Sequence, residues 1–280
     1  MSDADTSLDR DIQAAAALIS DADGLVITAG AGMGIDSGLP DFRGANGFWN
    51  AYPALGKLGI NFTAIANPGA FKSNPRLAWG FYGHRLQLYR ETVPHQGFEK
   101  LLALSGKMPN GERIFTSNVD GQFQKSGFAK GHVTECHGSI HHLQCMQQCG
   151  QDVWPADSFL PVVDVANCLL QSELPTCPHC GGLARPNILM FGDWDFQGEA
   201  YGQREASLHT WLARTSRPVV IEIGAGTTIP SARIFGEELG CPLIRINPAE
   251  WTVARKRDVG IALGAKQALI LIADAVLGSA

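Results

Sequence analysis

The spacing of apolar residues along the chain predicts a helix followed by a strand near the N-terminus. Residues 9–22 carry apolar side chains at helical spacing, which is typical of an amphipathic helix. The apolar positions are Ile12, Ala15, Ala16, Leu18 and Ile19. Residues 24–28 read Gly-Leu-Val-Ile-Thr, a β-branched run that predicts a short buried strand.

Three later segments have the same strand-like character. They lie at residues 113–116, 218–223 and 242–246, and each precedes a polar or glycine-containing turn and a helix-like stretch. Strands that alternate with helices build a parallel sheet with right-handed crossovers. The chain is therefore expected to be an α/β protein with a doubly wound parallel sheet.

Two stretches interrupt this alternation. Residues 45–87 contain aromatic residues and helix-like spacing without a clear strand, which predicts a helical insertion over the edge of the sheet. The second stretch runs from Cys145 to Cys180. No internal repeat or long linker separates these stretches, so we expect subdomains of one unit.

Composition fits a folded protein kept in a reducing compartment. The 280 residues are 45% hydrophobic and 18% charged, and the net charge of −5 argues against a nucleic-acid binder with a basic face. Seven cysteines form an odd set, and the first residues do not read as a secretory signal. No apolar run is long enough to span a bilayer. We therefore expect a soluble cytoplasmic protein.

The first predicted strand runs into a glycine-rich turn. Gly30, Gly32 and Gly34 follow it, and glycine lets backbone N–H groups approach a phosphate closely. Many α/β proteins use such turns only to change direction, but residues 36–44 add a rigid turn and an arginine suited to a pyrophosphate. The ribose-binding acid about twenty residues further on in hydride-transfer Rossmann sites is not obvious, which disfavours a dehydrogenase.

Polar residues also gather after the strand at residues 113–116. Asn118 and Asp120 follow it directly, and His137 comes after a short helix-like segment. Ligands of open parallel sheets bind at the carboxyl ends of the strands, where these groups could orient a sugar and move a proton. Taken alone, His137 also fits a hydrogen-bonded loop histidine, and His141 and His142 are interpreted as bystanders.

Four cysteines are spaced as metal ligands. Two pairs separated by a few tens of residues are typical of a tetrahedral zinc site, the alternative being unpaired buried thiols. Four thiolates close the coordination sphere, so the metal would be structural and His179 unnecessary as a ligand. The expected ligands are Cys145, Cys149, Cys177 and Cys180. The other three cysteines are interpreted as small apolar residues.

Together these motifs resemble the sirtuin (Sir2) family of NAD-dependent protein deacylases. The matching segments are residues 30–43, 116–120, 137–138, 185–192, 224–226 and 246–247, with the four cysteines. The resemblance implies a Rossmann-like, doubly wound parallel sheet with a small zinc-binding module and a helical insertion. The implied divisions are an NAD-binding domain at residues 1–44, 88–142 and 187–280, the insertion at 45–87, and the zinc module at 143–186.

The resemblance also implies a role for each matched residue. His137 is the expected general base, and Asn118 is expected to act beside it. Phe191 and Gly192 are expected to contact the substrate peptide. The residues expected to bind NAD are Gly30, Ala31, Gly32, Asp41, Phe42, Arg43, Ser117, Asn118, Asp120, Gly224, Ala225, Gly226 and Asn247. NAD would be consumed as a co-substrate beside one structural zinc ion, with nicotinamide, deacylated lysine and O-acyl-ADP-ribose as products.

One further match concerns the acyl group. Tyr82 and Arg85 resemble the Tyr and Arg, three residues apart, of the desuccinylase and demalonylase branch. Positions i and i+3 share a helix face, so the two side chains could grip a terminal carboxylate. The same spacing fits an amphipathic helix with a packed Tyr82 and a solvated Arg85. The expected activity is therefore deacetylation, with desuccinylation or demalonylation as a further possibility.

Departures from the family pattern keep other activities open. Ser117 stands where the family usually has Gln, Asp193 where it usually has Glu, and Trp194 follows. An ADP-ribosyltransferase or NAD hydrolase is the alternative enzyme, and a non-catalytic NAD-binding module that docks a partner is the alternative from another class. The expected partners are acyl-lysine proteins or peptides, without nucleic acid or membrane, and the chain is expected to be a monomer or weak oligomer.

Overall fold

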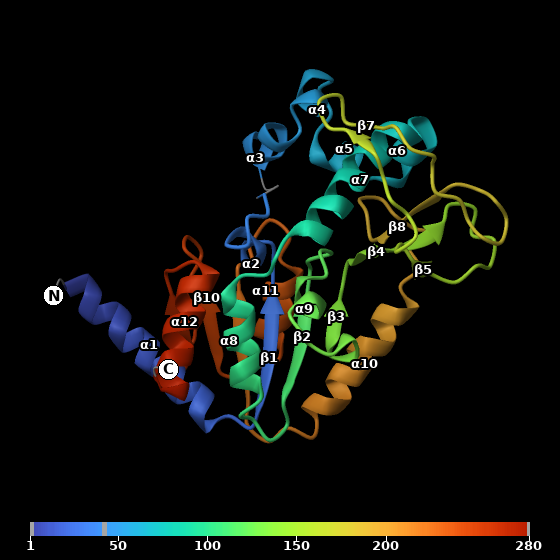
Figure 1. Ribbon diagram of the computed structural model, residues 1–280. Coiled ribbons are helices and arrows are strands. Elements are labelled where there is room, and N and C mark those ends of the chain that lie inside the picture. The colour runs from blue at the N-terminus through green and yellow to red at the C-terminus, as the bar shows by residue number, and fades with distance from the viewer. Residues whose placement is uncertain (1–2, 41–43, 279–280) are drawn as a thin grey trace.

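A six-stranded parallel sheet forms the centre of the computed structural model, which describes residues 3–40 and 44–278 (Figure 1). The strand order is β11-β10-β9-β1-β2-β3, and every neighbouring pair is parallel. The strands are β1 (Gly24–Ala29), β2 (Glu112–Thr116), β3 (Val133–Glu135), β9 (Pro218–Ile223), β10 (Leu243–Ile246) and β11 (Val259–Ile261). The predicted α/β class is confirmed.

Helices cover both faces of this sheet, because alternate strand residues point to opposite sides. On β1, Leu25 and Ile27 pack into the core shared with α1, α8 and α12, whereas Val26 packs toward α10 and α11. These helices are α1 (Asp3–Asp21), α8 (Gln96–Ser105), α10 (Glu199–Leu212), α11 (Ser231–Glu238) and α12 (Ala265–Leu277). Shorter helical segments are α2 (Gly32–Ile35), α9 (Gln122–Lys125) and η1 (Lys130–His132).

The four strands predicted from sequence are present within a residue of their expected ends, but the pattern did not predict the two edge strands. β3 and β11 have three residues each, too few to display a period. The N-terminal helix begins at Asp3 rather than at residue 9.

The predicted insertion is helical, and asparagine side chains set its helix starts. Asn61, Asn67 and Asn74 each accept a hydrogen bond from a backbone N–H of the first turn of the helix that follows. The last helix ends at Glu91, four residues beyond the predicted end at Gln87. The helices are α3 (Gly44–Ala51), α4 (Pro53–Lys57), α5 (Phe62–Ile65), α6 (Pro68–Ser73) and α7 (Pro75–Glu91).

The cysteine-containing stretch forms small antiparallel sheets that pack against this insertion above the carboxyl ends of the central strands (Figure 1). Gly80 of α7 approaches so closely that a Cβ there would lie 2.0 Å from the carbonyl oxygen of Cys168. The indole of Trp79 also donates to the carbonyl of Ala184, at 3.0 Å. The strands are β4 (Gly138–Cys145), β5 (Trp154–Pro155), β6 (Val163–Asp164), β7 (Leu169–Leu170) and β8 (Ala184–Ile188). The helical insertion and the cysteine-containing stretch therefore share one core.

None of the helices in the described part of the chain combines the length and apolarity that a bilayer crossing requires.

Candidate active site

Two glycine turns meet at the carboxyl edge of the sheet, because β1 and β9 are parallel neighbours. The N–H of Gly30 donates to the carbonyl of Ile223, and the N–H of Gly32 to that of Gly224, both at 3.0 Å. A Cβ on Gly32 would lie 2.6 Å from the Cα of Gly224, whose φ is +57°. The missing side chains thus let the two turns pack together, and binding of phosphate by Gly30, Ala31 and Gly32 stays a prediction.

The segment after β2 is bonded to the first of these turns. The side-chain amide of Asn118 donates to the carbonyl of Gly30 at 3.0 Å, and its backbone N–H donates to the hydroxyl of Thr116 at 3.0 Å. The backbone N–H of Ser117 donates to the carbonyl of Ala29 at 3.1 Å. Ser117 and Asn118 are therefore held beside the glycine turn, and their binding of NAD stays a prediction.

His137 lies between two strand ends. Its Nε2 is 3.2 Å from the hydroxyl oxygen of Ser231, the first residue of α11. Burial lowers the pKa of His137, and a hydrogen bond with the backbone of Ser117 acts in the opposite direction. The imidazole is therefore mainly neutral at pH 7, the form that can accept a proton. Sequence reasoning did not identify Ser231, because only the fold brings it to His137.

Asp120 is buried in the same region. Burial raises the pKa of this carboxyl group to about 6, while the N–H of Gln122 donates to Oδ1 at 2.9 Å and favours the ionised form. Nε2 of His141 lies 2.9 Å from the carbonyl oxygen of Asp120. His141, which the sequence did not assign to the site, therefore helps to position Asp120.

The turn after β9 is joined to the turn after β10 by Asn247. Its side-chain amide donates to the carbonyl of Ala225 at 3.1 Å, and its Oδ1 accepts from the N–H groups of Ala249 and Glu250. Asn247, Ala225 and Gly224 thus lie together at the carboxyl edge next to Gly32, and their binding of NAD stays a prediction.

The turn at Phe191 and Gly192 is anchored on both sides. Asn67 donates to the carbonyl of Phe191 at 2.8 Å. Asp193 pairs with Arg185 at 2.8 Å, and both side chains are almost fully buried. Asp193 therefore keeps an ionic partner despite being shorter than the usual Glu, whereas Trp194 is 96% exposed.

Tyr82 and Arg85 are both buried in α7. The Arg85 guanidinium lies 5.2 Å from the centre of the Phe81 ring and 5.8 Å from that of Tyr82. The solvated arginine considered above is therefore wrong. Tyr89, one turn further along α7, accepts hydrogen bonds from Arg85 and was not identified from the sequence, although its i+4 spacing was readable.

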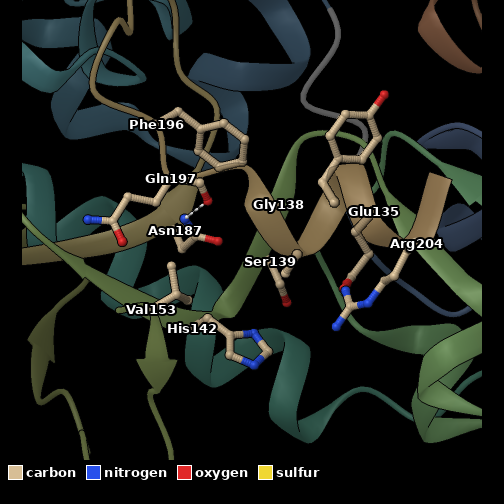
Figure 2. A pocket seen from close by; sticks show the side chains of 11 residues that line it. Glu135, Gly138, Ser139, His142, Val153, Asn187, Phe196, Gln197 and Arg204 are labelled. Carbon is tan, nitrogen blue, oxygen red and sulfur yellow. Dashed lines mark hydrogen bonds and ion pairs between the residues drawn. The ribbon is translucent and has the colours of Figure 1, made fainter. Parts of the chain in front are cut away.

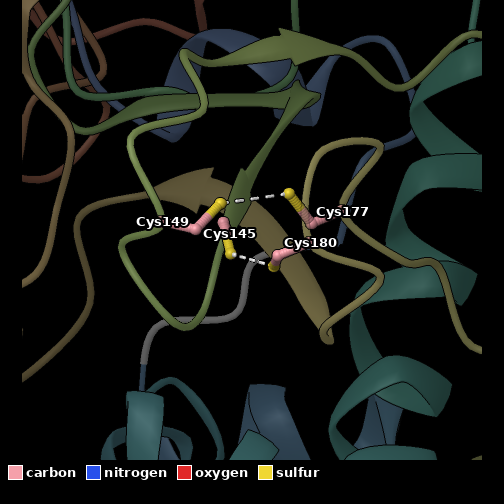
Figure 3. A group of neighbouring side chains, drawn as sticks. All are labelled: Cys145, Cys149, Cys177 and Cys180. Atoms are coloured by element: carbon pink, nitrogen blue, oxygen red, sulfur yellow. Dashed lines mark hydrogen bonds between the residues drawn. The ribbon is translucent and has the colours of Figure 1, made fainter.

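The four predicted zinc ligands lie together (Figure 3). Their sulfur atoms are all within 4.8 Å of one another, with Cys145–Cys180 at 3.6 Å and Cys149–Cys177 at 3.5 Å. Ligands about 2.3 Å from a tetrahedral zinc would be about 3.8 Å apart, so the cluster fits the ion. Nδ1 of His179 is 3.3 Å from the sulfur of Cys149, which places it beside the cluster.

A small cavity lies between β3, β4 and α10 (Figure 2). Glu135, Ser139, His142 and Arg204 line it, and an oxygen of Glu135 is 3.6 Å from a nitrogen of Arg204. Burial raises the pKa of Glu135 to about 7, against the attraction of Arg204. The cavity offers about 40 Å³, room for one or two water molecules.

Three predicted NAD-binding residues, Asp41, Phe42 and Arg43, lie outside the described residues.

Comparison with known proteins connects these features. The family model described as the Sir2 family matches residues 30–206. The chain is 30% identical over 240 residues to an NAD-dependent protein deacylase of Aquifex aeolicus (strain VF5), covering 84% of this chain and 87% of the relative. It is 33% identical over 244 residues to NAD-dependent protein deacylase 1 of Pseudomonas aeruginosa PAO1, covering 85% and 88%.

Solved structures share the fold. A crystal structure of a Sir2 homologue in complex with NAD superimposes with a TM-score of 0.67 and 22% identity, covering 94% of this chain and 92% of that one. A Sir2 homologue mutant in complex with ADP-ribose gives 0.69 with 23% identity, covering 94% and 95%.

Proposed function

This chain belongs to the Sir2 family, and from that premise we propose that it is an NAD-dependent protein-lysine deacylase. It consumes NAD, acyl-lysine and one water molecule and releases nicotinamide, deacylated lysine and O-acyl-ADP-ribose. The observation that carries this conclusion is that Asn118 is bonded to the first glycine turn, while the His137 ring is bonded to Ser117 and to Ser231, with Asp120 two residues after Asn118. A neutral imidazole, an amide and a carboxylate there can bind a ribose and move its protons.

The residues divide the chemistry between them. NAD supplies the ribose carbon that the acyl oxygen attacks and the nicotinamide that leaves. Asn118 and Asp120 hold the ribose and the carboxamide, and neutral His137 accepts the proton of a ribose hydroxyl as that hydroxyl captures the acyl carbon. Gly30, Ala31 and Gly32 are proposed to bind the phosphates, and the family resemblance assigns Phe42 and Arg43 to the reacting ribose.

The remaining predicted positions have roles in binding the nicotinamide, the adenosine and the substrate peptide. Ser117 lies beside the nicotinamide side, and the turns after β9 and β10 hold the adenosine. Phe191 and Gly192 contact the substrate peptide, and the hydrogen bond from Asn67 to the carbonyl of Phe191 holds their turn in place. The residues of the adenosine side are Gly224, Ala225, Gly226 and Asn247.

We further propose that the enzyme accepts acyl groups that end in a carboxylate. The support is that Arg85 is buried and follows Tyr82 by three residues on α7. This helix packs in the core that the helical insertion shares with the cysteine-containing stretch. A guanidinium largely removed from water attracts an anion more strongly than a solvated one. Arg85→Met should therefore lower activity on succinyl-lysine much more than activity on acetyl-lysine.

Transfer of ADP-ribose to protein or water is the second candidate. It is suggested by Ser117 and by the altered turn at Asp193 and Trp194, but the buried ion pair of Asp193 with Arg185 stabilises that turn. This observation favours the deacylase. The chain is proposed to act in the cytoplasm as a monomer or weak oligomer on acyl-lysine proteins, without nucleic acid or membrane.

The test measures nicotinamide release from NAD with and without acyl-lysine peptide. The proposal expects release that depends on the acylated peptide and no release with the same peptide carrying free lysine. Release that is independent of peptide would select the hydrolase or ADP-ribosyltransferase.

A further inference from the structure

Tyr89 lies one helical turn after Arg85 on α7, and both side chains are buried. We propose that Tyr89 is a positioning residue that holds the Arg85 guanidinium for the negatively charged end of the substrate's acyl group. The inference rests on the proposed deacylase function and deepens it. It names a residue that determines which acyl class is accepted.

The contact between the two side chains is specific. Nε and one terminal nitrogen of Arg85 donate to the hydroxyl oxygen of Tyr89, at 3.0 and 2.7 Å. The i, i+4 spacing puts both residues on one helix face. The guanidinium also lies 5.2 and 5.3 Å from the ring centres of Phe81 and Tyr89. Two hydrogen bonds to one oxygen restrict a side chain that otherwise has several rotatable bonds.

The chemistry of the acceptor matters as much as its place. Arginine stays charged in proteins, and a buried charge needs polar partners. Burial raises the pKa of the Tyr89 phenol, so this hydroxyl is neutral at working pH. A neutral oxygen can orient the guanidinium without cancelling its charge, whereas a carboxylate at the same position would compete with an anionic substrate. The Tyr89 hydroxyl thus orients Arg85 without placing a negative charge beside it.

The position of the pair relative to the reacting groups supports this role. The charge of Arg85 is among the influences that lower the pKa of Asp120, and Asp120 in turn raises the pKa of Tyr89. Tyr89 also belongs to the same apolar core as Val119, the residue between Asn118 and Asp120, so this core connects the pair to the proposed NAD site. An acyl chain directed toward Arg85 would keep its carbonyl end near that site. Malonyl, succinyl and glutaryl groups have the required terminal carboxylate.

The experiment compares kcat/KM for succinyl-lysine with that for butyryl-lysine, a neutral acyl group of the same chain length, in one peptide. The variants are Tyr89→Phe, which removes one oxygen and keeps the ring, Arg85→Met, and Tyr201→Phe as a matched control on α10. Because the ratio is measured within one protein, partial loss of folded enzyme cancels.

We expect Tyr89→Phe to lower the succinyl-to-butyryl ratio about tenfold, chiefly through a higher KM for the succinyl peptide. Arg85→Met should lower the ratio further, and Tyr201→Phe should leave it at the wild-type value. An unchanged ratio in Tyr89→Phe, or an equal loss on both substrates, overturns the inference when Arg85→Met does change the ratio. No effect of Arg85→Met overturns the proposed carboxylate binding too. Wild-type protein inactive on every acyl-lysine overturns the deacylase function itself.

Discussion

Nε2 of His137 lies 3.2 Å from the hydroxyl oxygen of Ser231, so the proposed general base is held by the first residue of α11. The ring also hydrogen-bonds to the backbone of Ser117, and a carbonyl can only accept. We assign that bond to the other ring nitrogen, which leaves Nε2 to accept from Ser231. The imidazole is thereby oriented by the segment after β2 and by the start of α11.

Ser231→Ala should lower kcat about fivefold, because one neutral hydrogen bond that orients His137 is lost. The measurement is the rate of deacylation at saturating NAD and peptide. His137→Ala is the reference and should abolish acyl transfer. A Ser231→Ala enzyme with wild-type kcat would show that the hydroxyl does not orient the base.

Glu135→Gln should stabilise the protein at pH 8 and much less at pH 5. The pKa of Glu135 rises to about 7 in the folded protein from an ordinary value near 4.5. Its contribution to stability is present below the unfolded pKa and is lost as pH rises through 7. The free energy of unfolding should therefore increase by about 1–3 kcal/mol at pH 8 in the variant.

Urea unfolding of both proteins at the two pH values measures this difference. Glu99→Gln, at an exposed position of α8, is the matched control and should change little at either pH. Equal effects of Glu135→Gln at pH 5 and pH 8 would contradict the assigned ionisation.

Cys177→Ser should release the zinc ion and destabilise both the zinc module and the helical insertion. The four cysteines belong to the zinc module, whose apolar side chains share one core with α7. Loss of the metal therefore weakens both the zinc module and the helical insertion. Metal analysis should find one zinc per wild-type chain and less in the variant, with a lower melting temperature. Cys241→Ser, away from the cluster, should keep the metal; full zinc content in Cys177→Ser would refute the ligand assignment.

Asp193→Asn should destabilise the protein by about 3–5 kcal/mol, because it leaves the buried charge of Arg185 without its ionic partner. The same change should raise KM for the peptide, since Asp193 also accepts the backbone N–H groups of Met190 and Asp195 around the turn. Denaturant unfolding and peptide titration measure the two effects. Trp194→Ala is the control for stability, because its side chain is exposed and should contribute little.

Local patterns predicted the central part of the fold well. The buried strands β1, β2, β9 and β10 carry β-branched runs, and the cysteine spacing alone predicted the cluster of four cysteines. β3 and β11 are too short to display a period. The two glycine turns are visible in the sequence. Their mutual contact through Gly32 and Gly224 depends on the order of the strands in the sheet, which no single segment encodes.

The site residues also fall into those that local motifs predict and those that only the fold brings together. His137 and Asn118 were found from motifs, whereas Ser231 reaches His137 across 94 residues of sequence and left no local signal. Tyr89 stands four residues after Arg85, but this spacing alone does not distinguish a positioning residue from a packing residue. The domain boundaries, the NAD contacts and the roles of Asp41, Phe42 and Arg43 stay predictions.

The most direct test of the account is the product balance of one reaction with NAD and an acetyl-lysine peptide. Nicotinamide, deacetylated peptide and O-acetyl-ADP-ribose should form in equal amounts, and all three should be absent without the acylated peptide. Nicotinamide formed together with free ADP-ribose or ADP-ribosylated protein, while the acetyl-lysine peptide remains intact, would contradict the deacylase assignment.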